Sequence, residues 1–170
     1  VSAALGRELM EAAEHGEVAA AVELIEAGAD VNQVMLGDGA PMIVAARRGD
    51  LPLVKLLLQH GANVNIAVPG DGNPLIMAAG GGHMEVVTTL VEHGANLNGI
   101  VIGDETPLIN AARAGHLGIV RYLVERGADV NLAVPSDSVP FARIRSPLSE
   151  ATKHRREDVV QYLRARGARA

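Results

Sequence analysis

Gly28-Ala29-Asp30-Val31-Asn32 is the first of four closely similar pentapeptides in this chain of 170 residues. The others are Gly61-Ala62-Asn63-Val64-Asn65, Gly94-Ala95-Asn96-Leu97-Asn98 and Gly127-Ala128-Asp129-Val130-Asn131, each 33 residues after the one before. Two more series keep this step: alanine pairs that begin at Ala12, Ala45, Ala78 and Ala111, and turn pairs that end in Asp38, Asp71, Asp104 and Asp137. Three series with one period indicate that the chain is built from stacked repeats.

The unit at residues 37–69 shows how each repeat is expected to fold. Pro41 to Arg48 predicts a first helix, because proline is favoured at a helix start and Gly49 follows its end. Asp50 can cap a second helix that stops at Gly61 and carries its leucines and valines on one face. The chain then runs extended and turns at 70–72, which predicts a hairpin-like finger. Two such short helices cannot bury an apolar face alone, so the units must stack.

These units resemble the ankyrin repeat. Thr106-Pro107-Leu108 matches the family's Thr-Pro-Leu signature, Ser146-Pro147-Leu148 nearly does, and Gly82-His83 and Gly115-His116 match its second-helix entrance. The resemblance covers practically the whole chain and implies an all-α solenoid of five repeats with β-hairpin fingers. It implies a single domain, 1–170, with units at about 1–36, 37–69, 70–102, 103–135 and 136–170, the first and last being caps.

The sequence also has features of its own. Residues 68–79 are similar to bacterial ankyrin arrays, including those that follow the membrane-embedded zinc peptidase domain of beta-lactam-sensor-type regulators. The family's histidine after Pro-Leu is replaced by Ile43, Ile76 and Ile109, for which we expect apolar packing. The last unit has Arg155 where the family has a glycine between the helices, and seven extra residues fall around 136–146.

The composition suits thin layers better than a large globular core. There is no tryptophan, two tyrosines and one phenylalanine, so the apolar content is mainly Ala, Val, Leu and Ile. The absence of cysteine excludes disulfides and thiolate metal sites. No apolar run approaches the ~20 residues that cross a bilayer, so we expect no membrane insertion. We read the chain as a mature fragment or an excised domain, soluble and either cytoplasmic or periplasmic.

The net charge of −5 argues mildly against duplex nucleic acid as a partner. The charge is unevenly placed, because acids far outnumber bases up to Gly99 and the balance turns basic beyond it. Cations that complement helix ends account for the basic end better than an anion-binding patch does, and both interpretations stay open.

No catalytic or cofactor chemistry is evident in the sequence. His60 and His93, like His83 and His116, are equivalent positions about one layer apart, too distant to share a metal ion at ~2 Å. The acids form no recognisable acid–base pair, and the serines lie in no nucleophile elbow. The glycines at 80–82 follow no strand and precede no Lys-Ser/Thr, so we interpret them as a helix end rather than a phosphate loop. We therefore expect a protein that is not an enzyme and holds neither metal nor cofactor.

Three sets of residues, and one insertion, are candidates for contact with a partner. The finger-tip acids fit either tight turns or a regular row of carboxylates for a basic partner: Asp38, Asp71, Asp104 and Asp137. We expect about half of the apolar finger residues to pack on adjacent fingers and the rest to form an exposed ridge. The candidates for this ridge are Met35, Leu36, Val68, Val101 and Ile102.

The third set lies on the inner face of the first helices, where varied chemistry fits contact residues and an unconstrained surface equally: Val44, Arg47, Arg48, Met77, Asn110, Arg113, Glu150 and Lys153. The insertion holds the only phenylalanine, Phe141, followed by Arg143 and Arg145, which fits either a contact hot spot or a disordered loop.

The function predicted from these features is recognition of a protein or peptide through the concave face and the finger tips by a monomer. One alternative is a regulatory or sensory module that docks on a linked catalytic or membrane domain. A weaker one is an engineered scaffold without a natural ligand, against which the insertion and the glycines at 80–82 argue.

Overall fold

The computed structural model describes residues 2–35, 37–101, 103, 105–135 and 144–169. In these ranges ten helices follow one another as five pairs: α1 (Ser2–His15) with α2 (Val18–Glu26), α3 (Pro41–Arg48) with α4 (Leu51–Gln59), α5 (Pro74–Gly81) with α6 (Met84–Glu92), α7 (Pro107–Ala114) with α8 (Leu117–Glu125), and α9 (Pro147–Lys153) with α10 (Glu157–Ala165). A short hairpin of β1 (Val134–Pro135) and β2 (Ile144–Arg145) lies between the last two pairs. The expected all-α solenoid with hairpin fingers is confirmed, and the bounds of its units stay a prediction.

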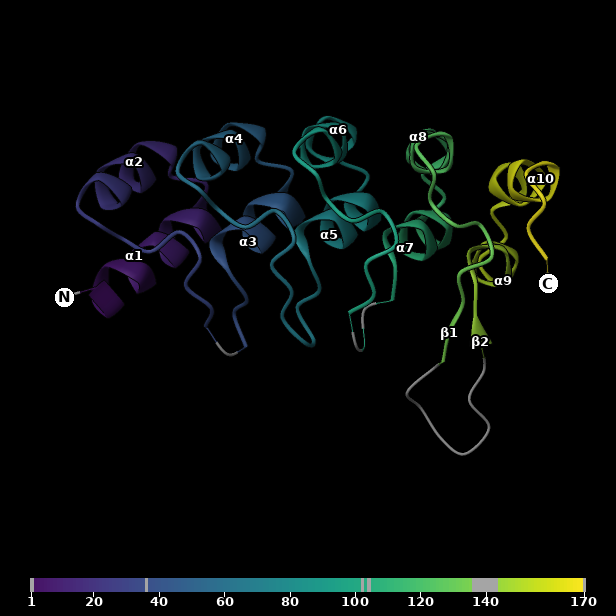
Figure 1. Ribbon diagram of the computed structural model, residues 1–170, viewed down its shortest axis with the longest axis horizontal. Coiled ribbons are helices and arrows are strands. Elements are labelled where there is room, and N and C mark those ends of the chain that lie inside the picture. The colour runs from purple at the N-terminus through teal and green to yellow at the C-terminus, as the bar shows by residue number, and fades with distance from the viewer. Residues whose placement is uncertain (1, 36, 102, 104, 136–143, 170) are drawn as a thin grey trace.

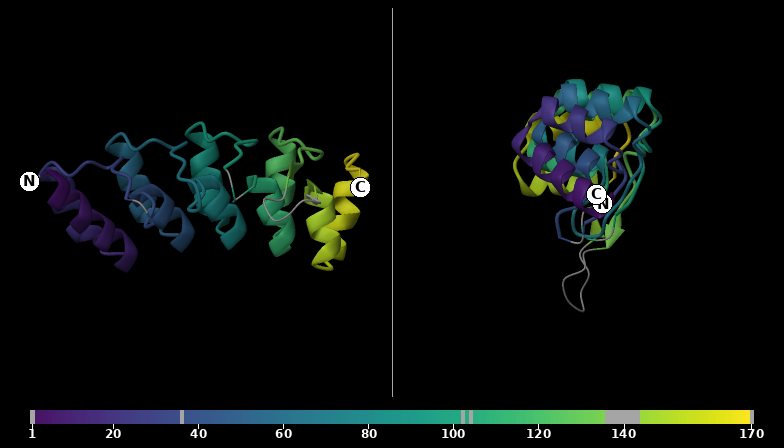
Figure 2. Two further views of the ribbon diagram at one scale, coloured as in Figure 1. Left: turned by 90° about the horizontal axis from the view of Figure 1, so that it is seen from below. Right: turned by 90° about the vertical axis from the view of Figure 1, so that its left-hand side faces the viewer.

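The helices form two rows. The first helices of the pairs lie side by side, the second helices form a parallel row above them, and the fingers project from the other side of the first row (Figure 1). The two ends of the chain lie at opposite ends of the stack (Figures 1 and 2). Each first helix contacts the first helix of the next pair, as α3 does α5 and α5 does α7. The core is therefore a continuous layer between units rather than a central globule.

Small and branched residues fill the space between units. The alanine pairs of the central first helices are fully buried: Ala45, Ala46, Ala78, Ala79, Ala111 and Ala112. Ile43, Ile76 and Ile109 are at most 1% exposed, which confirms that apolar packing takes the place of the family's histidine. Small side chains let the helical layers approach closely, so the core reaches high density without large aromatics.

The helix ends follow the sequence signals. Asp50 caps α4 by accepting a hydrogen bond from the Leu53 amide at 3.0 Å, as expected. Thr106 and Asn73 accept equivalent hydrogen bonds at the starts of α7 and α5. The glycines at 80–82 are the last turn and left-handed cap of α5, which confirms that they are a helix end.

The asparagine that ends each pentapeptide joins one unit to the next. Asn65 donates from Nδ2 to the carbonyl of Gly94 at 3.1 Å and accepts at Oδ1 from the amide of Asn96 at 2.8 Å. Asn32 makes the same pair of hydrogen bonds to the following unit, and so does Asn131. Each such bond contributes about 0.5–1.5 kcal/mol net, so the recurrence of Asn is explained by coupling between units.

A second link crosses between units at the start of the second helices. His83 Nε2 donates to the carbonyl of Arg47 at 3.0 Å, and His116 Nε2 donates to that of Gly80 at 3.1 Å. In the last unit Arg156 takes this place and donates from Nε to the carbonyl of Arg113 at 3.0 Å. These histidines therefore serve a structural role in the turn.

The turn after α9 keeps its shape without a glycine. Arg155 has φ 56°, in the left-handed region that Gly49, Gly82 and Gly115 occupy at the corresponding turns. A residue with a side chain is strained there by roughly 1–2 kcal/mol. The final unit is therefore built on a less stable turn than the units before it.

Candidate functional site

The fingers alternate between buried and exposed side chains. Val68, Val101 and Val134 pair across their hairpins, and all three are buried. The residue just before each pairing position faces solvent: Val34, Ala67, Ile100 and Ala133. This is the two-residue period of extended backbone, in which neighbouring side chains point to opposite faces.

The expectation that Val68 and Val101 form an exposed ridge is therefore wrong, because they are only 4% and 5% exposed. Val44, expected on the inner face, is also in the core, because it points from α3 into the layer between units. The large exposed apolar residues of the fingers are instead Val34, at 47%, Ile100, at 54%, and Ile144 in β2, at 69%. Val34 and Ile100 belong to the same apolar finger segments as the ridge candidates, and they lie one residue before Met35 and Val101.

The finger-tip acids are only partly covered by the described residues. Asp38 is exposed and Asp71 is half-buried. Asp38 and Met35 line a hollow of about 380 Å³ beside α1, together with Arg7, Met10, Glu11 and Glu14. Five expected site residues lie outside the described ranges: Leu36, Ile102, Asp104, Asp137 and Phe141.

The first helices present a row of accessible side chains with different chemistry. Arg47 and Arg48 at the end of α3 are exposed, and Met77 on α5 is half-buried. Asn110 and Arg113 on α7 are half-buried and lie one helical turn apart. The first helices form the row from which the fingers descend, so these helices and the fingers border one side of the stack (Figure 1).

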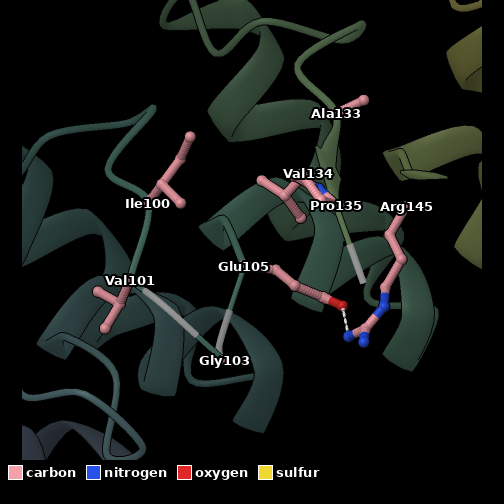
Figure 3. Close-up of a pocket in the computed structure, with 8 residues that line it drawn as sticks. All are labelled: Ile100, Val101, Gly103, Glu105, Ala133, Val134, Pro135 and Arg145. Carbon is pink, nitrogen blue, oxygen red and sulfur yellow. Dashed lines mark hydrogen bonds and ion pairs between the residues drawn. The ribbon is translucent and has the colours of Figure 1, made fainter. Parts of the chain in front are cut away.

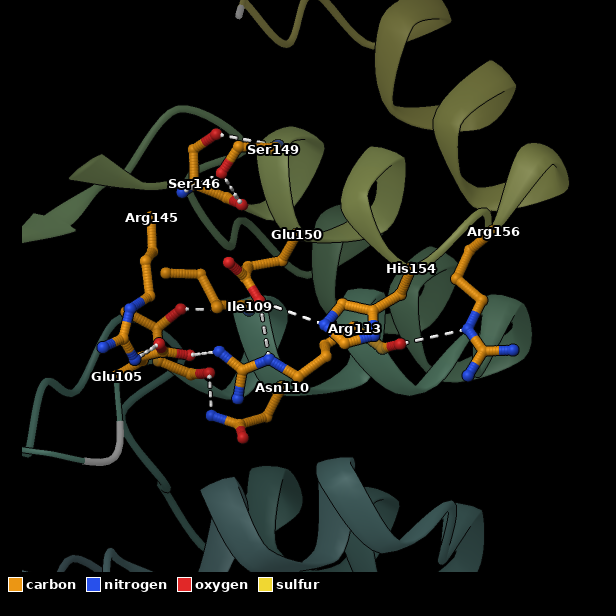
Figure 4. Close-up of polar contacts among 11 residues, drawn as sticks. Glu105, Ile109, Asn110, Arg113, Arg145, Ser146, Ser149, Glu150, His154 and Arg156 are labelled. Atoms are coloured by element: carbon orange, nitrogen blue, oxygen red, sulfur yellow. Dashed lines mark hydrogen bonds and ion pairs between the residues drawn. The ribbon is translucent and has the colours of Figure 1, made fainter. Parts of the chain in front are cut away.

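Glu105 is the most unusual residue of the site. Its φ is 70°, at a position where the first two fingers have Gly39 and Gly72, so its backbone is strained. It is also only 4% exposed, and its two carboxylate oxygens accept from different arginines: Oε1 from Arg145 and Oε2 from Arg113 (Figure 4). A buried charge is tolerated only when it is paired, and here both oxygens are.

A second acid, Glu150, completes this network; it was expected on the inner face but is only 4% exposed. Glu150 on α9 accepts from Arg113 Nε at 2.7 Å, and His154 Nε2 lies 3.6 Å from the same oxygen (Figure 4). Burial by itself raises the pKa of Glu150, but the hydrogen bond from Arg113 and its charge outweigh burial and hold that pKa below its usual range. Burial lowers the pKa of Arg113, yet its two carboxylate partners raise it beyond the ordinary value. Both groups are therefore charged at neutral pH, and the network fixes α9 on α7.

A small cavity lies beside this network, between the third and fourth fingers (Figure 3). Its volume is about 160 Å³, and apolar side chains make up most of its wall: Ile100, Val101, Ala133, Val134 and Pro135. Glu105 and Arg145 form its polar side. The arrangement is a hydrophobic recess with an ion pair at one edge, suited to recognition rather than to bond chemistry.

Sequence reasoning missed Glu105, and it considered Arg145 only as one of the two arginines of the insertion that follow Phe141. The seven-residue insertion shifts the fourth finger, so the period of 33 does not bring the two residues into correspondence. The signal was nonetheless present, because each immediately precedes the Thr-Pro-Leu or Ser-Pro-Leu start of a first helix.

Among the described residues, no group of three or more His, Asp or Glu side chains could hold a metal ion. None of the helices in those ranges combines the length and the hydropathy that a membrane span requires.

A family model for ankyrin repeats (3 copies) matches the chain at residues 9–101, 42–134 and 101–170, which together extend over most of its length. No curated protein sequence matches the chain.

Proposed function

Because the chain belongs to the ankyrin repeat family, we propose that it is a non-catalytic scaffold that binds a protein or peptide through its first helices and fingers. Ankyrin repeats are generally protein–protein interaction modules, and domains built from them are typically non-catalytic. The proposal goes further than the family does by assigning the binding surface on this chain to particular side chains.

The observation that carries the proposal is the row of accessible side chains on one rigid frame. Arg47 and Arg113 occupy the same repeat position on α3 and α7, with Met77 on the helix between them, and all three are accessible. The frame beneath them is held by buried alanines and by hydrogen bonds between units. A surface ordered before binding loses little entropy when a partner arrives.

The exposed apolar residues of the fingers supply affinity. Burial of Val34 or Ile100 by a partner contributes up to roughly 1.5–3 kcal/mol each. Exposed charged residues of the fingers and first helices, such as Asp38 and Arg47, contribute less affinity because they are solvated, but they fix the orientation and the specificity of the complex.

Selection of a random peptide library, displayed on phage, against the immobilised full chain tests this function. Peptides should be enriched, and the charge reversal Arg47→Glu combined with Met77→Asp should weaken their binding. Lys55→Glu is the matched control, because Lys55 is exposed on α4 in the opposite row of helices. Failure to enrich any peptide, or equal loss with Lys55→Glu, contradicts the proposal.

A further inference from the structure

The cavity between the third and fourth fingers has the size of a side chain. Its volume of about 160 Å³ is well below the roughly 300–1,000 Å³ of sites for drug-sized ligands. Ile100 stands at its edge with 54% of its surface exposed, whereas the equivalent positions of the second and fourth fingers carry alanine. The third finger therefore places a large exposed apolar side chain beside this recess.

Arg145 gives the cavity a polar edge with donors to spare. Its side chain is 27% exposed, and one terminal nitrogen donates to Glu105 (Figure 3). A guanidinium has five N–H donors, and within the described ranges Arg145 donates to no acceptor other than Glu105. The remaining donors can receive an oxygen that enters from outside.

Glu105 fixes the direction of this guanidinium. Because it accepts from Arg113 through its other oxygen, Glu105 is itself held on two sides, and its strained backbone keeps the carboxylate buried. Arg145 is thus ordered before any ligand arrives, which lowers the entropy lost on binding. Backbone strain of this kind is concentrated at ligand sites, so the positive φ of Glu105 and the adjacent cavity both indicate a binding site.

The charge of the surrounding region favours an anionic ligand. Residues 100–170 contain eleven Lys and Arg against eight Asp and Glu, although the chain as a whole is acidic. The planar fork of an arginine matches the geometry of a carboxylate, which is the anionic group that the side chains of an unmodified peptide carry.

From these observations we propose that the cavity binds a peptide segment in which an aliphatic residue adjoins an aspartate or glutamate. The aliphatic side chain enters between Ile100 and Val134, and the side-chain carboxylate accepts from Arg145. This inference rests on the proposed binding function and names the class of peptide that it recognises.

The test uses peptides enriched from the same display library, resynthesised with amidated C-termini so that side chains supply every carboxylate. Enriched sequences should contain an aliphatic–acidic pair. Replacement of the acid by its amide, Glu by Gln or Asp by Asn, should weaken binding to the full chain about tenfold or more, measured by fluorescence anisotropy.

Variants of exposed residues test the location without disturbing the core. Ala133→Glu places a negative charge in the cavity wall, and Ile100→Ser removes its apolar edge; each should weaken binding about tenfold. Ala67→Glu is the matched control for Ala133→Glu, because it alters the equivalent exposed position in the second finger. Met84→Ser is the control for Ile100→Ser, because Met84 is an exposed apolar residue on α6, in the opposite row of helices. The controls should leave affinity unchanged, and circular dichroism should show all four variants folded.

The outcomes separate the two proposals. Peptides without an acid, or peptides that bind Ala133→Glu and Ala67→Glu equally, overturn the cavity proposal. If such peptides still lose affinity with Arg47→Glu and Met77→Asp, the binding function stands without it. If no peptide is enriched on the wild-type chain, both fail. A requirement for a free peptide C-terminus would contradict the side-chain carboxylate as the source.

Discussion

Glu105 and Arg145 occupy the same position in consecutive fingers, 40 residues apart, and form an ion pair across the groove between them. The first two fingers have glycine at this position, whereas the third and fourth fingers have a charged residue. Arg113 shares the same carboxylate and also binds Glu150, which connects the third finger, α7, the fourth finger and α9 in one network. Glu105 and Arg145 also line the recess between the third and fourth fingers.

The strain at Glu105 can be measured by comparing two substitutions. Glu105→Ala and Glu105→Gly both remove the carboxylate, but only glycine relaxes at φ 70°. We expect the glycine variant to be more stable than the alanine variant by about 1 kcal/mol in chemical unfolding. Gly39→Ala, at the equivalent position of the first finger, should lower the free energy of unfolding by a similar amount. If alanine and glycine at 105 are equally stable, the backbone there is not strained.

Arg155→Gly should stabilise the chain. Relief of the left-handed backbone at φ 56° is worth roughly 1–2 kcal/mol, and the greater freedom of glycine in the unfolded chain offsets part of it. We expect a net gain of about 0.5–1 kcal/mol in the free energy of unfolding. Arg155→Ala separates backbone from charge, because it removes the cation and keeps the strain. Stabilisation by alanine as large as by glycine would assign the effect to charge.

Because of Glu150, the free energy of unfolding should depend on pH in the acidic range. Its pKa in the folded chain lies below the ordinary value of 4.5, so its charged form adds stability above about that pH. As pH falls through the lowered pKa, the folded carboxylate also becomes protonated and the contribution is lost. The stability difference between wild type and Glu150→Gln should therefore be large at neutral pH and shrink in acid, in urea unfolding over a pH series. Glu92→Gln, at an exposed carboxyl on α6, serves as the control. A difference that stays constant or grows in acid contradicts this account.

The alternation along the second finger predicts opposite results for neighbouring residues. Val68→Asp buries an unpaired charge and should lower the free energy of unfolding by about 3–5 kcal/mol. Ala67→Asp, one residue earlier and exposed, should change it by less than about 0.5 kcal/mol. Thermal melts of the two variants at matched concentration measure this contrast. Similar losses for both would mean that the second finger does not have one buried and one exposed face.

Much of the fold could be predicted from the sequence because its signals are local and repeated. Each helix signal acts within a few residues, as Pro41 does at a helix start, Asp50 as a cap and the recurring glycines at helix ends. Similar signals recur every 33 residues along the chain. The burial of Ile43 followed from the same reasoning, because an apolar residue in a stacked first helix is expected to pack against a neighbouring unit.

The candidate site was harder to predict because it depends on register and on contacts between fingers. Whether Val68 or Ala67 faces inward is decided by a shift of one residue, which composition does not reveal. The pairing of Glu105 with Arg145 was hidden by the insertion, which moves the equivalent position from 138 to 145. Aligning Thr106 with Ser146 restores the correspondence, but the ion pair itself follows only from the distance between adjacent fingers.

Hydrogen–deuterium exchange of the full chain, with and without a saturating selected peptide, tests the binding account most directly. We expect protection in α3, α5 and α7 and in the fingers, strongest around Ile100 and Arg145, with the second helices unchanged. Protection confined to α4, α6 and α8 would place the partner on the opposite row of helices and contradict the account.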